Sequence, residues 1–457
     1  MKSTWHILRF PFFGGLAAVF ALCSAPAFAL PFVAQSTYGG AGDEIGTGVA
    51  ASGSGVYFTG IDGASSRGLL GQFSSSLASP PIWSRLWAGP PTDPGQFRGV
   101  ALAGSGVIAV GQSYYQTVDT VGGKEGKGIT VKFNADGSSG GGAGGAVWTR
   151  QTPAAPGGFA YGGIEFLTGV STVSEGGQMR IYTAGLGQPG FSGDIGRFVT
   201  KLDESGNILW SRTDSTTITH PPAGTTSELW GTRTTGIAAT GDSLYVASRK
   251  EAGGVHPDLK KYDSNGNLLW TRNSVAAGEY RAVTSAGGNV YAVGQTNPDT
   301  ANPDFLIESW DGLGNLLWSR IYARSSTEDI LNGVVFEGGH LFAVGSTKGG
   351  TAGGTDGVLL EIDALTGNLI DSTLWGGAAD DLFNDLAIAG SRLYALGSTR
   401  SFGAGGSDVA IVSFSLPSSG VPEPATLLLT SLGMAGLALA RRRVGIGNAP
   451  KLPGLGS

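Results

Sequence analysis

One short strand-forming pattern recurs along this chain and limits the folds that are open to it. Each copy is a run of mostly β-branched or aromatic residues that ends in a small residue. The seven copies are 56–60, 107–111, 181–185, 244–248, 290–294, 341–345 and 393–397, at intervals of 51, 74, 63, 46, 51 and 52 residues. A strand signal repeated at this spacing is typical of a circular or stacked array of small β-sheets.

Three more strand-like segments accompany each copy. One apolar segment precedes it and another follows it, as at 48–50 and 129–133. A fourth carries Trp-Ser/Thr-Arg, beginning at Trp83, Trp148, Trp210, Trp270 and Trp318. The phrase Asp-x-x-Gly-Asn at 203–207 and 263–267 lies before this fourth segment, where a hairpin turn requires positive φ. Four short strands per repeat predict one propeller blade per repeat.

The two ends of the repeat array complement each other. The sixth repeat ends in Leu-Ile-Asp-Ser-Thr-Leu-Trp-Gly-Gly at 369–377, and residues 32–40 read Phe-Val-Ala-Gln-Ser-Thr-Tyr-Gly-Gly. The seventh repeat has three strands and ends near Phe414 and Leu416. We therefore predict an all-β fold, a seven-bladed β-propeller over 30–416 whose last blade is closed by the N-terminal strand, which removes the open edges of the ring.

Composition excludes several functions. Residues 30–416 hold 23 Lys and Arg against 34 Asp and Glu, a net charge near −11 that disfavours nucleic acid and anionic lipid. The single cysteine, Cys23, lies near the N-terminus, so the rest of the chain has no disulfide, thiol nucleophile or thiolate metal site. His220, His256 and His340 are far apart in sequence. The residues thus indicate neither a metal nor a cofactor.

The N-terminus has the pattern of a secretory signal. Lys2 and Arg9 precede an apolar run at 12–23, and Ala27 and Ala29 supply the small residues of a signal peptidase site. The run is shorter than the ~20 apolar residues of a membrane anchor, which is the alternative interpretation. We expect signal peptidase to remove residues 1–29, so that the mature protein begins at Leu30.

A second sorting pattern lies at the C-terminus. A linker at 417–424 contains Pro422, Glu423 and Pro424, a mostly apolar segment begins at 425, and Arg441, Arg442 and Arg443 close the segment 425–443. This order resembles the PEP-CTERM sorting signal. The resemblance implies a hydrophobic sorting helix, transient membrane anchoring, and processing by an exosortase-type membrane protease in Gram-negative bacteria that make exopolysaccharide. The tail at 444–457 departs from the usual pattern, and a plain C-terminal anchor is the alternative.

The repeats themselves resemble bacterial SBBP β-propeller repeats. Those units begin with a YLGG-x-GDD-like phrase, continue with a VYVTG-like strand and end in a DAFVAKLDPSGN-x-xW-like phrase. Residues 38–44, 56–60 and 198–207 match these three parts in turn. The resemblance covers most of residues 30–416, is weaker in the second and third repeats, and implies a fold more than a function, since propellers host unlike activities.

Several residue sets suggest chemistry that the repeat explains more simply. An Asp opens the third strand in five repeats, at Asp194, Asp258, Asp304, Asp356 and Asp408. These aspartates could form a ring around the channel that holds Ca²⁺. The interpretation that we favour is that each one serves as a turn or cap device. The EF-hand-like start at Asp263 lacks the later Gly and Glu and is predicted to be a hairpin turn. GxSxG at 137–141 and GxGxxG at 185–190 lack the required strand–helix context, so neither predicts a site. The Trp residues are predicted to pack between blades rather than to stack on sugars.

Two classes of function remain. The first is a non-enzymatic surface or matrix protein that binds exopolysaccharide or another surface protein through one propeller face. The second is an exported propeller enzyme, either a polysaccharide lyase or hydrolase or a quinoprotein-like dehydrogenase, whose Trp-docking motif resembles Asp-x-x-Gly-Asn-x-x-Trp at 203–210 and 263–270. We favour the binding module, with no catalytic residue assigned.

The two terminal signals predict the boundaries of the mature protein. Mass spectrometry of the protein from its native host should find an N-terminus at Leu30 and a C-terminus near Pro422–Pro424, outside the inner membrane. A surface-exposed chain that still carries Arg441–Arg443 would contradict the sorting prediction.

Overall fold

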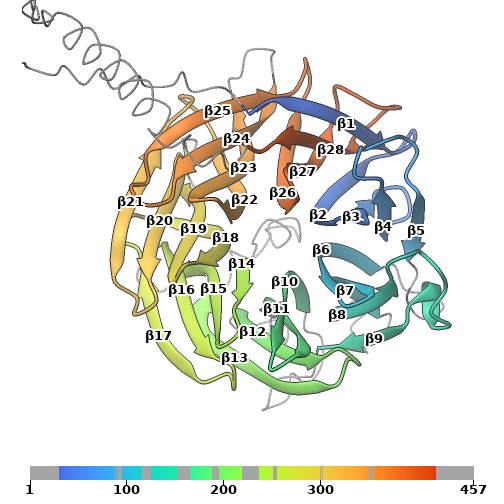
Figure 1. Cartoon of the computed structure of the whole chain (residues 1–457), viewed down its shortest axis with the longest axis horizontal. Helices are drawn as coiled ribbons and strands as arrows, with labels where there is room; N and C mark the ends of the chain where they lie inside the picture. The colour runs from blue at the N-terminus through green and yellow to red at the C-terminus, as the bar shows by residue number, and fades with distance from the viewer. Residues whose placement is uncertain are drawn as a thin grey trace, which may run out of the picture.

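The computed structural model describes residues 30–417, apart from 88, 90–94, 116–124, 153–164, 188–194, 219–235, 251–254, 299, 301 and 349–353. The described residues form seven four-stranded sheets around a central axis (Figure 1). The predicted all-β, seven-bladed propeller is confirmed. The N-terminal signal at 1–29 and the linker, hydrophobic segment and tail from 418 onward lie outside the described residues.

The blades follow one another in sequence order. Blade 1 contains β2 (Glu44–Ser52), β3 (Gly55–Asp62), β4 (Arg67–Phe73) and β5 (Trp83–Trp87). Blade 2 contains β6 (Gly95–Ala103), β7 (Gly106–Tyr115), β8 (Glu125–Asn134) and β9 (Trp148–Gln151), with the 3₁₀ helix η1 (Ala143–Gly145) before β9. Blade 3 contains β10 (Glu165–Glu175), β11 (Gln178–Gly187), β12 (Ile195–Asp203) and β13 (Ile208–Ile218). Blade 4 contains β14 (Gly236–Ala239), β15 (Ser243–Lys250), β16 (His256–Asp263) and β17 (Leu268–Asn273).

The remaining blades complete the ring. Blade 5 contains β18 (Gly278–Ala286), β19 (Asn289–Thr296), β20 (Phe305–Asp311) and β21 (Leu316–Tyr322). Blade 6 contains β22 (Asp329–Glu337), β23 (His340–Lys348), β24 (Thr355–Asp363) and β25 (Leu369–Trp375). Blade 7 contains β26 (Asp381–Ala389), β27 (Arg392–Thr399), β28 (Asp408–Ser415) and β1 (Phe32–Tyr38). The first strand of each blade lies nearest the axis and the fourth lies at the rim (Figure 1).

Burial explains why the second strand of each blade is mostly apolar instead of alternating. Each blade is covered on both faces by its neighbours, so both sets of side chains of a second strand are buried. In β23, four consecutive residues from Leu341 to Val344 are all fully buried. The rim strands differ, since Leu268 and Leu269 of β17 are each about half exposed.

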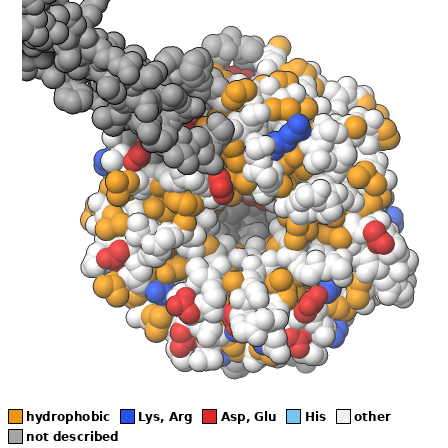
Figure 2. Space-filling view, in the orientation of Figure 1, with side chains coloured by type: hydrophobic (Ala, Val, Ile, Leu, Met, Phe, Trp, Pro, Cys, Tyr) orange, Lys and Arg blue, Asp and Glu red, His pale blue; other side chains and the backbone are white. Residues whose placement is uncertain are grey.

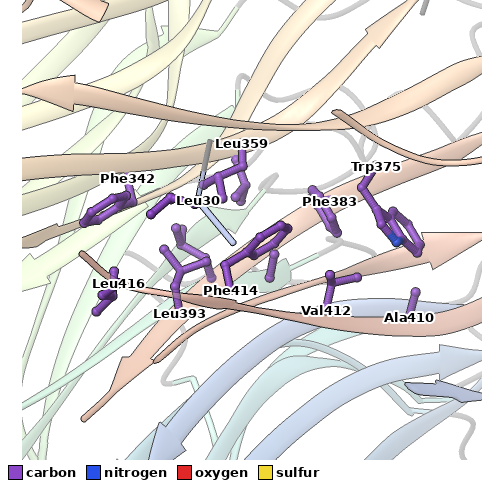
Figure 3. Close-up of a cluster of buried hydrophobic side chains, with 13 residues drawn as sticks. Leu30, Phe342, Leu359, Trp375, Phe383, Leu393, Ala410, Val412, Phe414 and Leu416 are labelled. Carbon is purple, nitrogen blue, oxygen red and sulfur yellow. The ribbon is translucent and has the colours of Figure 1, made fainter. Parts of the chain in front are cut away.

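The N-terminal strand closes the ring, as predicted. β1 pairs antiparallel with β28, from Phe32 opposite Phe414 to Tyr38 opposite Val409. Leu30, just before β1, packs into a buried cluster between blades 6 and 7 that includes Trp375 and Phe414 (Figure 3). A side-chain bond from Trp375 Nε1 to Gln35 Oε1, 2.9 Å long, ties β1 to blade 6.

At the rim, Trp and Arg of one blade hold the outer turn of the next. Trp210 Nε1 donates to Ser264 O at 3.0 Å, and Arg212 Nε donates to Gly266 O at 3.1 Å. Equivalent contacts to the following blade are made by Trp148 and Arg150, Trp270 and Arg272, and Trp318 and Arg320. Gly266 has φ of +79°, and a Cβ there would lie 2.9 Å from the Trp210 ring. Both the backbone conformation and the space beside the indole therefore require glycine at this turn. The predicted inter-blade packing of the Trp series is confirmed.

Closure by β1 predicts a large effect of its removal. Deleting residues 30–38 exposes the edge of β28 and empties the Leu30 site, so we expect aggregation or a fall in Tm of at least about 5 °C. Thermal unfolding followed by circular dichroism checks this. Val33→Ala, on the exposed side of β1, is the matched control and should leave Tm nearly unchanged. A deletion variant with the Tm of the intact chain would show that β1 does not seal the ring.

The rim contacts predict that Trp270 is structural. Trp270→Ala removes an indole that contacts Tyr245 and the turn of blade 5, and we expect the free energy of unfolding to fall by about 2–4 kcal/mol. Urea titration measures this. The neighbouring exposed Leu269→Ala should change it by less than about 0.5 kcal/mol. Unchanged stability together with lost polysaccharide binding would instead make the Trp series a sugar-stacking array.

Candidate functional site

The first strands of the blades line a central channel. A cavity of about 300 Å³ lies along the channel wall, and a second of about 450 Å³ opens at one mouth. The centre of the disc is hollowed in the space-filling view (Figure 2). Both cavities share six polar side chains, one from each of six blades: Thr47, Arg98, Thr168, Arg281, Asn332 and Asn384.

These six residues occupy one structural position, a β-bulge in the first strand. In each of the six blades the pairing between first and second strands shifts by one residue at this point. A bulge turns the extra side chain out of the ladder and leaves nearby main-chain groups unpaired. In blade 4, β14 begins at Gly236, and the equivalent Thr235 lies outside the described residues. The six bulge residues therefore form a polar ring in the channel.

Three residues of the ring donate to main-chain carbonyls of the neighbouring blade. Thr47 Oγ1 donates to Phe97 O at 2.9 Å, Asn332 Nδ2 to Phe383 O at 2.9 Å, and Asn384 Nδ2 to Gly46 O at 2.7 Å. Each acceptor is the carbonyl just before the bulge of the next blade. A carbonyl left unpaired inside the protein is costly, so these side chains satisfy it. Part of the ring's polarity is thus used to hold the inner strands together.

The two arginines of the ring come from blades 2 and 5. Arg281 Nε donates to Glu279 Oε1 at 2.8 Å, and its Nη1 donates to Asn332 Oδ1 at 3.1 Å. The Arg98 guanidinium lies over the Phe166 ring, 5.8 Å from its centroid. Both side chains are half-buried and oriented by these contacts. The mouth therefore presents the guanidinium groups of Arg98 and Arg281 in fixed positions, in a propeller that carries net negative charge.

Asp385 departs from the repeat on the channel wall. The position after the bulge is Gly in five blades and Ala282 in blade 5, but it is Asp385 in blade 7. Its Oδ2 accepts from Val49 N at 2.9 Å and its Oδ1 from Leu386 N at 2.8 Å. Burial raises the pKa of Asp385 to about 6, against the opposing effect of these two amide donors. The carboxyl group thus joins blade 7 to blade 1 beside the polar ring.

The aspartates that open the third strands do not line the channel. Asp258, Asp356 and Asp408 are buried between blades, Asp304 is half-buried there, and Asp194 lies outside the described residues. Asp258 forms an ion pair with Arg197 of blade 3. A carboxylate ring around the channel is therefore wrong, because this end of the third strand faces the neighbouring blade rather than the axis. Within the described ranges, no group of three or more His, Cys, Asp and Glu side chains is arranged to hold a metal ion.

The remaining sequence motifs lie in turns, loops and strands of the blades. Asp263 begins a hairpin turn in which its carboxylate accepts the Asn267 main-chain and side-chain N–H groups, each at 2.8 Å, and these bonds lower the pKa of Asp263. The GxSxG segment forms a loop whose Gly137 packs on Trp83 of blade 1. Gly185–Gly187 belong to β11, and the rest of GxGxxG lies outside the described residues. His340 Nδ1 lies 2.7 Å from Glu361 Oε1, and His220 is not among the described residues.

Fold and sequence together define a seven-bladed β-propeller with a sorting motif. The family model of the PEP-CTERM protein-sorting motif matches residues 420–443, which confirms the predicted motif around Pro422–Pro424 and Arg441–Arg443. The motif implies export, processing by the membrane protein exosortase and sorting to the cell surface. Among the described residues no helix is long and apolar enough to cross a membrane. The SBBP type of the repeats stays a prediction.

Comparison of the chain with known proteins gives only weak likenesses. No curated protein matches the chain. A solved subtype N10 neuraminidase-like protein of A/little yellow-shouldered bat/Guatemala/060/2010 has 8% identity and a TM-score of 0.37, covering 84% of this chain and 99% of that one. The polysaccharide lyase Uly1 has 11% identity and a TM-score of 0.47, covering 81% and 90%. At these scores the likeness carries no information on activity.

Proposed function

We propose that this protein is a non-enzymatic surface or matrix module, processed by exosortase, whose propeller binds an acidic polysaccharide at the channel mouth. The observation that carries this proposal is the ring of bulge residues. The second strands repeat almost unchanged from blade to blade, whereas the bulge position varies between Thr, Arg and Asn. Variation at one channel-facing position of a repeated frame supports recognition there, because the frame itself needs no such variety.

The chemistry of the mouth supports an acidic sugar. Arg98 and Arg281 present planar guanidinium groups, which bind carboxylate and sulfate oxygens through paired N–H donors. Asn332 is bonded within the ring through both its amide N and O, but the Oδ1 of Asn384 and the hydroxyl oxygens of the two ring threonines are acceptors of the kind that bind sugar hydroxyls. The apolar side chains between them, such as Ile45 and Ile330, add contact area. The guanidinium groups also favour a polyanion over a neutral glycan in a propeller whose net charge would otherwise repel it.

The acidic groups of the channel support binding over catalysis. Among the described lining residues, the acidic ones are Asp385 and Glu328. Asp385 uses both oxygens to accept main-chain N–H groups, so neither is directed at a ligand. Glycoside hydrolysis uses two carboxyl groups aimed at the same bond, one as acid and the other as base or nucleophile. These contacts give Asp385 a structural role.

Binding by the full-length protein tests the proposal directly. In affinity electrophoresis, alginate, a polyuronate, should retard the protein and neutral dextran should not, and added NaCl should weaken the retardation. The variant Arg98→Gln/Arg281→Gln should bind alginate at least tenfold more weakly. Arg67→Gln, an exposed arginine at the start of β4, is the matched control and should bind as before.

Each other outcome points away from the proposal. Equal retention of both variants would remove the channel mouth as the site. Cleavage of alginate during the assay would favour the enzyme instead. Retention of a surface protein from the native host, with no retention by polysaccharide, would make that protein the ligand.

A further inference from the structure

Pairs of acidic side chains face each other at two neighbouring blade junctions. At the start of the third strand, Asp356 of blade 6 faces Asp381 of blade 7, and Asp408 of blade 7 faces Glu44 of blade 1. The exposed fraction is 3% for Asp356, 0% for Asp381, 1% for Asp408 and 8% for Glu44. Burying two like charges together is strongly unfavourable unless something neutralises them. Both junctions therefore need a neutralising partner.

Glycines at the ends of the rim strands make the close approach possible. A Cβ on Gly39 would lie 1.8 Å from Asp408 Oδ1 and 2.6 Å from Glu44 Oε2, so these two oxygens are close neighbours. A Cβ on Gly376 would likewise lie 2.3 Å from Asp356 Oδ1 and 3.0 Å from Asp381 Oδ2. The same glycine position thus leaves room beside both acidic pairs.

Hydrogen bonds fix the position of the first-strand acid in each pair. Asp381 accepts the hydroxyl of Thr399 and the main-chain N–H of Gly377, the latter at 2.7 Å. Glu44 accepts the N–H of Gly40 at 3.1 Å. The first-strand acid of each pair is therefore held in a fixed position at the blade junction.

The other acid of each pair has an oxygen without a partner. Among the described residues, Asp408 Oδ1 and Asp356 Oδ2 are buried and accept no hydrogen bond. Asp408 Oδ1 is the atom that points into the space beside Gly39 and Glu44. Burial and the charge of Asp381 raise the pKa of Asp356. A buried carboxylate oxygen that has no partner and lies beside a second carboxylate, as at Asp408, is a ligand that suits a hard cation.

The junction between blades 3 and 4 shows how the fold neutralises such an acid when a basic residue is available. There the equivalent Asp258 is paired with the buried Arg197. At the junction of blades 7 and 1, Arg400 instead lies 3.6 Å from Asp43, and both of these side chains are 56% exposed. Among the described side chains, no Lys or Arg forms an ion pair with Asp356, Asp381, Asp408 or Glu44, although the charge of Arg324 partly opposes the rise in the pKa of Asp356.

We propose that each of these two junctions binds a divalent cation of the Ca²⁺ class, which bridges the carboxylates of adjacent blades. Hard oxygen ligands with few nitrogen or sulfur neighbours favour Ca²⁺. Each pair supplies two carboxylates, so water and main-chain oxygens complete the coordination shell. Such a low ligand charge fits the ~10⁻⁴–10⁻³ M affinity of extracellular calcium modules. The proposal is independent of polysaccharide binding.

Thermal unfolding of the full-length protein, with CaCl₂ alone as the probe, tests this inference. Relative to EDTA, about 5 mM CaCl₂ should raise Tm by several degrees, and MgCl₂ at the same concentration should raise it less. Asp356→Asn/Asp408→Asn should abolish the calcium-dependent shift. In EDTA its Tm should equal or exceed that of the wild type, because the like-charge repulsion is gone.

A matched variant and a second measurement separate loss of calcium binding from loss of folding. Asp258→Asn breaks the ion pair with Arg197 and should lower Tm but keep the full calcium shift. Titration calorimetry should find one calcium site fewer in each single variant than in the wild type, which covers the case of a double variant that does not fold. A Tm indifferent to calcium would overturn the proposal, as would a calcium shift that survives the double substitution. A Tm that rises at pH 5.5 without responding to calcium would show that the acids share a proton, and would also overturn it.

Discussion

The pairing of β1 with β28 is the constraint on which the rest of the structure depends. Every blade buries both faces against its neighbours, so the array is stable only if the last blade also meets the first. A sheet of three strands at that point would leave a hydrogen-bonding edge and an unfilled core site for Leu30. The antiparallel register from Phe32 to Tyr38 supplies both the missing strand and the missing side chains. The channel and the blade junctions exist because this ring is closed.

Hydrogen bonds between blades differ with distance from the axis. At the rim, Trp and Arg side chains hold the turn of the following blade, and the same residues recur in blade after blade. Near the axis, side chains at the bulges satisfy main-chain carbonyls, and these residues differ between blades. The rim can be uniform because it meets the same turn each time. The inner ring lines the channel and meets no such repeated turn, and its residues differ from blade to blade.

The repeat predicted the blades, the closing strand and the packing of the Trp series, because each depends on local strand patterns and turn residues. The polar ring was missed. Thr47, Arg98 and Asn384 carry no shared residue type, and a bulge is visible only in the pairing of two strands. A weak signal was present, since most of these residues stand directly before Gly-Val or Gly-Ile in the first strand. The Asp series was recognised, but its place between blades depends on contacts between residues from different repeats.

The closing strand comes from the start of the chain, and this determines when the ring can be completed. Ala34 and Ser413 lie 379 residues apart, yet they meet in the finished ring. Contacts this distant in sequence form late, because a long loop must close before they contribute. The first strand to leave the ribosome therefore has no partner until the last blade has been made. A propeller sealed in this way stays incomplete until the whole repeat array has been synthesised.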